Sequence, residues 1–189
     1  MQVVSLWSHR ARFQHDAQKR PRCNQMLDYV RWLSDLGMGD VPVVGGKNAS
    51  LGEMIQHLTR VGVQVPGGFA TTADAYREFR AKDGLDERIQ SELDALDVED
   101  VATLADTGPK IRRWIFEQPF QPALEGAIDD AFHTLTSNAG GEVSWAVRSS
   151  ATAEDLPDAS FAGQQETFLN VRGLDQVIAR IHDVYASLF

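Results

Sequence analysis

The feature that most constrains the fold is the stretch Ala146–Val171, near the end of the 189-residue chain. An apolar run at residues 143–147 predicts a buried strand that presents Arg148 at its end. Small and hydroxylated residues follow, and a second strand-like run covers residues 167–171. Short side chains let a ligand approach the backbone, and a guanidinium matches phosphate geometry. The stretch is therefore interpreted either as one wall of an anion site or as a surface hairpin with a hydrophilic loop.

A second candidate for anion binding is Gly45-Gly46-Lys47, which stands between an apolar run and a predicted helix. The glycines permit close backbone approach, a helix N-terminus favours an anion, and Lys47 adds a mobile charge. The segment is not a Walker A loop, because Val41 and Asn48 stand where that motif needs Gly and Ser or Thr. An ordinary tight turn is the alternative. If the fold brings Lys47 and Arg148 together, the two cations form a polyphosphate clamp.

Hydrophobic periodicity predicts an α+β fold in which short strands flank a helical middle. Strands are expected near residues 29–33, 69–71, 143–147 and 167–171, and helices near residues 50–61, 72–82, 85–96, 100–117, 124–135 and 174–188. Ser50 and Glu53 form a capping-box pattern at the start of the first helix, and Pro109 is a point where the fourth can kink.

The last helix carries an apolar face that includes Leu174, Ile178, Ile181 and Tyr185, and the sequence stops soon after it, at Phe189. This pattern is interpreted as that of a truncated chain. The face is expected to lack its natural cover, which would leave an exposed apolar patch and promote self-association.

Residues 1–26 differ in composition from the rest of the chain. They contain five Arg or Lys residues against one acid, Asp16, and show no clear helical or strand period. A basic arm and a targeting peptide are alternatives, and a disordered extension is the preferred interpretation. Residues 27–189 are then the folded domain.

The overall composition excludes several classes of function. The net charge is −9, which argues against a nucleic-acid surface, although a local cationic pocket remains compatible with it. The single cysteine, Cys23, fits a reducing cytoplasm, and no apolar run is long enough to span a membrane. The five histidines are scattered, without zinc-ligand or nucleophile–base spacing, so no metal site is predicted. Acids near the two loops are interpreted as solvated, with contact to a metal-nucleotide as the alternative: Asp35, Asp40, Glu154, Asp155 and Asp158.

Three sequence blocks, at residues 44–54, 65–72 and 146–171, together resemble the N-terminal nucleotide-binding domain of phosphoenolpyruvate synthases. The domain is shared with pyruvate phosphate dikinases and, more distantly, with rifampin phosphotransferases. The resemblance begins at about Leu27 and implies the first part of an ATP-grasp-like domain. It also implies that Lys47 and Arg148 contact ATP phosphates, and that Gly163 and Thr167 belong to a loop over those phosphates.

The complete enzymes of this family use ATP, Mg²⁺, pyruvate and water to make phosphoenolpyruvate, AMP and phosphate, through a phosphohistidine on a separate domain. This chain stops before the family's metal-binding acids, its phosphohistidine and its pyruvate domain. The resemblance therefore implies no catalytic residue and no metal ligand in this chain. It implies that pyruvate binds only to the missing domains and that a homodimer is formed, if at all, by the full-length enzyme. The isolated chain is not expected to complete the reaction, and it is expected to bind ATP weakly or not at all.

Two alternatives to a phosphoenolpyruvate synthase fragment stay open. One is the N-terminal domain of a pyruvate phosphate dikinase or a rifampin phosphotransferase, although the run Trp32–Asp40 favours the synthase. The other is a non-catalytic nucleotide-binding module or remnant.

Overall fold

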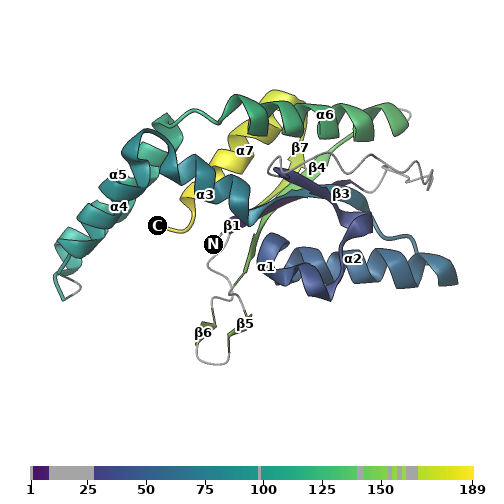
Figure 1. Cartoon of the computed structure of the whole chain (residues 1–189), viewed down its shortest axis with the longest axis horizontal. Helices are drawn as coiled ribbons and strands as arrows, with labels where there is room; N and C mark the ends of the chain where they lie inside the picture. The colour runs from purple at the N-terminus through teal and green to yellow at the C-terminus, as the bar shows by residue number, and fades with distance from the viewer. Residues whose placement is uncertain are drawn as a thin grey trace.

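The computed structural model describes residues 2–8, 28–97, 99–139, 143–152, 155–156, 159–160 and 166–189. It has one five-stranded antiparallel sheet with helices on both faces (Figure 1). The strand order is β2 (Val30–Trp32), β3 (Gly67–Thr71), β1 (Gln2–Ser8), β4 (Trp145–Ala151), β7 (Thr167–Val171). A separate two-stranded sheet pairs β5 (Asp155–Leu156) with β6 (Ala159–Ser160). This architecture confirms the α+β class.

All six helices that the periodicity predicted are observed, and the short helix α1 was not predicted. They are α1 (Val41–Val44), α2 (Gly46–Leu58), α3 (Ala73–Ala81), α4 (Leu85–Asp94), α5 (Val101–Glu117), α6 (Pro122–Asn138) and α7 (Leu174–Ala186), with 3-10 turns η1 (Leu33–Asp35), η2 (Met38–Asp40), η3 (Thr59–Val61) and η4 (Lys82–Gly84). Side-chain caps explain two of the starts. Thr72 Oγ1 accepts a hydrogen bond from Ala75 N at 3.2 Å, and Asp100 Oδ1 accepts one from Ala102 N at 3.0 Å. Helix α5 continues through Pro109.

The predicted capping box at the start of α2 is wrong. The helix begins at Gly46, so Ser50 lies in its second turn, where its hydroxyl contacts Met38 Sδ at 3.7 Å. The residue before the helix is Gly45, with φ 79° and ψ 162°. A side-chain cap is unnecessary here because strand β4 supplies the partner for an N-terminal amide.

The prediction of a disordered N-terminal extension is wrong for Gln2–Ser8. This segment forms β1, which pairs antiparallel with β3 on one side and with β4 on the other. Val4 and Leu6 are fully buried on one face, and Ser5 is fully buried on the other. The segment was assigned together with the basic residues that follow it, and its position in the sheet depends on partners about 60 to 150 residues away. The basic residues of the head, within 9–27, lie outside the described residues, so the domain boundary itself stays a prediction.

The predicted end of the β4 strand is also wrong. Residues 143–147 were expected to form the strand, with Arg148 at its end and a loop beyond it. The strand runs on to Ala151 and places Arg148 in its middle, with Ser149 and Ser150 buried. Pairing with β1 keeps these small residues in the sheet, and their size lets the neighbouring layers approach closely.

The core has two layers, one on each face of the sheet. On one face, sheet residues including Leu6, Phe69 and Val147 pack against α3 to α7. On the other face, Ala70 packs with residues of η1, α1 and α2, and Trp7 packs against this second cluster. Figure 1 shows α6 and α7 on one side of the sheet, with α1 and α2 on the other.

The uncovered apolar face predicted for α7 is not observed. Ile181 and Tyr185 are fully buried, and Leu174 and Ile178 pack against the main core. The helix lies on β1 and β4 and also contacts α5 and α6. The prediction failed because it took no account of a sheet completed by β1, against which this face packs.

Candidate functional site

Lys47 lies in the first turn of α2, directly after the tight connection from α1. The connection depends on Gly45, whose positive φ is a conformation that other residues adopt with strain. A Cβ at this position would also overlap the backbone and hydroxyl of Ser150. Gly45 therefore brings the N-terminus of α2 directly against strand β4.

Three hydrogen bonds hold this helix terminus in place. Asn48 N donates to Ser150 Oγ at 3.2 Å, and Asn48 Nδ2 donates to the Val44 carbonyl at 2.8 Å. Arg148 Nη2 donates to the Lys47 carbonyl over a long contact of 3.5 Å. Lys47 and Arg148 thus lie next to each other in the fold, although they are 101 positions apart in the sequence.

Strand β7 brings a third predicted residue to the same place. Thr167 is the register partner of Arg148 in the antiparallel β4–β7 pair. Residues directly opposite in such a pair project to the same face of the sheet. Thr167 is exposed and Arg148 is half-buried, so the face is accessible beside the α2 terminus. Gly163, the fourth predicted residue, lies outside the described residues.

Three sources of positive charge belong to the segments that meet at this corner. The N-terminus of a helix carries a partial positive charge, and Lys47 and Arg148 add two full charges next to it. Two of the acids that the sequence placed near the loops form local hydrogen bonds: Asp40 Oδ2 accepts from Gly37 N at 2.9 Å, and Asp35 Oδ1 accepts from Ser34 Oγ at 3.1 Å. The side chains of Glu154, Asp155 and Asp158 are outside the described part of the structure.

Sequence reasoning missed Asn48 and Ser150 as residues that build the site. Ser150 was interpreted only as a member of a ligand-facing loop, whereas its buried hydroxyl joins β4 to α2. Asn48 was considered only as a departure from the Walker A pattern. No local signal identifies the pair, because the two residues are 102 positions apart.

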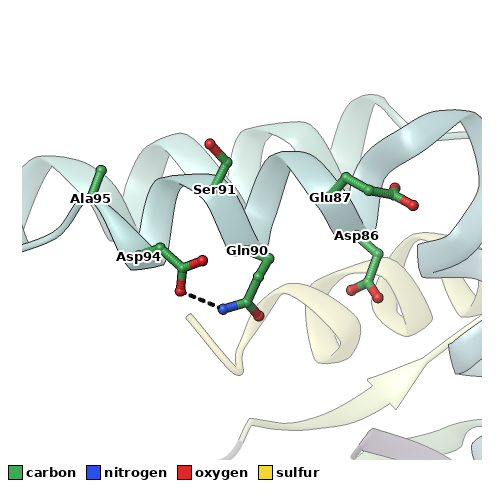
Figure 2. Close-up of a pocket in the computed structure, with 6 residues that line it drawn as sticks. All are labelled: Asp86, Glu87, Gln90, Ser91, Asp94 and Ala95. Carbon is green, nitrogen blue, oxygen red and sulfur yellow. Dashed lines mark hydrogen bonds between the residues drawn. The ribbon is translucent and has the colours of Figure 1, made fainter.

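A surface depression on α4 is a separate feature. Figure 2 shows its six lining residues, which all belong to α4 or directly follow it: Asp86, Glu87, Gln90, Ser91, Asp94 and Ala95. Its three carboxylates disfavour a phosphate. Asp86 pairs with Arg80, and Asp94 Oδ1 accepts from Gln90 Nε2 at 2.7 Å. Among the described residues, no group of three or more His, Cys, Asp or Glu side chains is arranged to hold a metal ion.

The described histidines are engaged away from the Lys47–Arg148 corner. His57 pairs with Glu53 at 3.0 Å, and His133 pairs with Asp129 at 3.1 Å. The ring of His182 packs on that of Phe120, with 3.8 Å between centroids, and burial lowers the pKa of His182. Within the part of the chain that the structure describes, no helix is both long and apolar enough to cross a membrane.

Comparison with known proteins identifies the domain type. The family model described as pyruvate phosphate dikinase, AMP/ATP-binding domain, matches residues 41–189. Phosphoenolpyruvate synthase of Neisseria meningitidis serogroup B is 61% identical over 163 residues, which are 86% of this chain and 20% of that protein. The phosphoenolpyruvate synthases of Pseudomonas aeruginosa and Escherichia coli K12 are 60% and 58% identical, over 87% and 85% of this chain. The chain spans about a fifth of the length of these relatives.

Proposed function

Because this chain belongs to the family of pyruvate phosphate dikinase AMP/ATP-binding domains, we propose that it binds the phosphates of ATP at the Lys47–Arg148 corner. The observation that carries this proposal is the hydrogen bond from Arg148 Nη2 to the Lys47 carbonyl. This hydrogen bond joins the segment that carries Arg148 to the segment that carries Lys47, beside the N-terminus of α2. Hydrogen-bond donors and positive charge at one accessible face are what a polyphosphate requires.

Each residue has a distinct proposed role. The planar guanidinium of Arg148 binds two phosphate oxygens at once, whereas the Lys47 ammonium follows the phosphates as a mobile point charge. The Thr167 hydroxyl, on the same face as Arg148, donates to a phosphate oxygen. Gly163 permits close approach of the following segment to the phosphates. The Asn48–Ser150 hydrogen bond holds the N-terminus of α2 against strand β4 before ATP binds.

Mg²⁺ accompanies ATP in the proposed complex, but the described residues do not fit a protein-held metal ion. No suitable group of carboxylates or histidines converges among them. A Mg²⁺ ion needs oxygen ligands in near-octahedral geometry. The nucleotide phosphates and water are therefore its proposed ligands on this part of the chain.

We propose phosphoenolpyruvate synthesis as the reaction that this domain serves: ATP, pyruvate and water yield phosphoenolpyruvate, AMP and phosphate. The support is the shared name of the relatives cited above, which favours a synthase over a dikinase or a rifampin phosphotransferase. Four fifths of those relatives have no counterpart in this chain. Pyruvate binding, the phosphohistidine and any homodimer contacts are accordingly proposed for the parts of those enzymes that this chain does not match, and the isolated chain is expected to form no phosphoenolpyruvate.

Calorimetric titration with Mg-ATP tests the nucleotide site. The variant Lys47→Ala/Arg148→Ala should weaken binding by at least about a hundredfold, because a hydrogen bond to a charged group contributes about 1.5–3 kcal/mol and about 1.4 kcal/mol is tenfold in Kd. The matched control is Lys110→Ala/Arg113→Ala, which removes the same two charge types from the exposed surface of α5 and should leave binding unchanged.

Three results would each reject a different part of the proposed function. Equal binding by wild type and the Lys47→Ala/Arg148→Ala variant would reject the residue assignment while keeping the nucleotide function. Absence of binding by the wild type would reject the proposal that this chain binds ATP by itself. Formation of phosphoenolpyruvate from ATP and pyruvate would reject its inactivity in isolation.

A further inference from the structure

The central strand of the sheet comes from outside the residues that match the family model. That match covers residues 41–189, whereas β1 is formed by Gln2–Ser8 and lies between β3 and β4. Strand β2 also precedes residue 41, but it lies at the edge of the sheet. Two of the strands in the family-matched part, β3 and β4, therefore face each other across β1 and are not paired with each other.

The backbone of β1 satisfies both of these edges. Its register runs from Ser5 opposite Ala70 to Ser8 opposite Gly67 on the β3 side, and from Gln2 opposite Ala151 to Trp7 opposite Ala146 on the β4 side. Unpaired N–H and C=O groups at buried positions are strongly unfavourable, and open strand edges recruit other strands. The space between β3 and β4 therefore needs an extended occupant.

The side chains around this space select the pattern of the occupant. Val4 and Leu6 enter the core formed with α3 to α7, and Trp7 packs on the opposite core near α1 and α2. At Gly68 a Cβ would overlap the Leu6 carbonyl, so the backbones are in close contact there. Ser5, opposite both Ala70 and Arg148, is fully buried, so only a small side chain fits at that position.

We propose that the space between β3 and β4 is a strand-acceptor groove, which Gln2–Ser8 occupies in cis and which binds a separate extended peptide of the same pattern when β1 is withdrawn. The groove takes apolar side chains at alternate positions and a small residue between them. Strand addition of this kind obtains affinity from main-chain hydrogen bonds and specificity from alternate side-chain pockets. The proposal is independent of nucleotide binding, although the groove borders the segment 148–150 of the candidate site.

Occupancy in cis is tested by engineered disulfides in the full chain, with Cys23→Ser removing the native thiol. The pair Ser5→Cys/Ala70→Cys joins register partners on one face. The matched control is Ser5→Cys/Thr71→Cys. Thr71 Oγ1 accepts from Tyr185 Oη at 3.4 Å, so its side chain points to the opposite face, toward α7. We expect the first pair to cross-link under mild oxidation at least tenfold faster than the control. Equal rates, or no cross-link with either pair, would overturn the placement of β1.

Exchange of the occupant is tested with the full-length Val4→Asp/Leu6→Asp variant, in which two buried positions of β1 become charged. A fluorescein-labelled peptide with the sequence of residues 2–8 should bind this variant saturably, with rising anisotropy. It should bind at least tenfold more tightly than the same peptide carrying Leu6→Asp, and wild-type protein should not take it up because its groove is filled. If the variant is unfolded alone, the peptide should restore its circular dichroism. Absence of both binding and refolding would overturn the acceptor groove.

Discussion

At the scale of single residues, two buried serines on neighbouring strands differ in their hydrogen bonding. Ser150 Oγ accepts from Asn48 N at 3.2 Å, which joins β4 to the first turn of α2. Ser5 Oγ, within the described part of the chain, has no hydrogen-bond partner. A buried polar group stabilises only when it is paired, so the two hydroxyls should contribute to stability with opposite sign.

Ser150→Ala should lower the free energy of unfolding by about 1–3 kcal/mol, because it leaves the buried Asn48 N–H without an acceptor. The matched control, Ser5→Ala, removes an unpaired hydroxyl and should be neutral or stabilising by about 1 kcal/mol. Urea denaturation of both variants measures the difference. Equal destabilisation would show that the Asn48–Ser150 hydrogen bond has no special role.

His182 should make stability depend on pH. Burial against Phe79 and Phe120 lowers its pKa below the ordinary value of 6.5, although a backbone hydrogen bond to Ile115 and the charge of Asp183 oppose the shift. The neutral ring is thus favoured in the folded state. The stability that the neutral His182 ring contributes to the folded state is fully present above pH 6.5. It is lost as the pH falls through the lowered pKa.

The test of this pH dependence is the difference in unfolding free energy between wild type and His182→Gln from pH 8 to pH 4.5. The unfolding free energy of the wild type should fall relative to that of His182→Gln as the pH drops below 6.5. The reason is that His182 takes up a proton in the unfolded chain at a higher pH than in the folded one. A pH-independent difference would contradict the role assigned to burial.

At the scale of elements, α2 is the part that positions the candidate site. Gln56 Nε2 donates to the Leu36 carbonyl at 2.7 Å, and Glu53 Oε1 accepts from Met38 N at 3.1 Å, so the helix is attached along its length to η1 and η2. Gly52 packs on the same segment, and a Cβ there would overlap the Leu36 carbonyl. The terminus that carries Lys47 is thus held by contacts one to three turns away.

Gly52→Ala should destabilise the protein although alanine is the better helix former, because the clash is with backbone that cannot rotate away. Gly126→Ala in α6 is the matched control: a Cβ there meets nothing within 4 Å, so the variant should gain up to about 1 kcal/mol. Chemical denaturation compares the two. A stabilising effect of Gly52→Ala would show that α2 can move away from η1 at little energetic cost.

At the scale of the whole molecule, β1 joins the two cores. Its residues alternate between the cluster packed on α3 to α7 and the cluster near α1 and α2. The face of α7 that seemed uncovered in the sequence packs on β1 and β4. The seven-residue strand Gln2–Ser8 therefore completes a sheet whose other strands lie between residues 30 and 171.

Leu6→Ala should cost about 2–5 kcal/mol of unfolding free energy, because the side chain is fully buried in the central strand. The control is Leu169→Ala in β7, where the leucine is 64% exposed and the change should stay within about 0.5 kcal/mol. Urea denaturation distinguishes them. A small effect of Leu6→Ala would indicate that β1 contributes little to the folded state.

The sequence by itself determined the features that depend on nearby residues. The helix starts near residues 72 and 100, the apolar period of α7 and the strand at residues 167–171 are local patterns, and each agrees with the structure. The Gly-Gly-Lys segment was expected before a helix that begins near residue 50, whereas α2 already begins at Gly46. Family membership followed from several motifs in order along one chain and was confirmed by the match to residues 41–189.

Only the tertiary structure decided where distant segments meet. The neighbourhood of Lys47 and Arg148, the Asn48–Ser150 hydrogen bond and the position of β1 join residues that are about 60 to about 150 positions apart. The end of β4 was mistaken because Ser149 and Ser150 are poor strand signals until β1 lies beside them. Burial and backbone pairing between strands override local preference, since each strand is stabilised by neighbours that its own sequence does not contain.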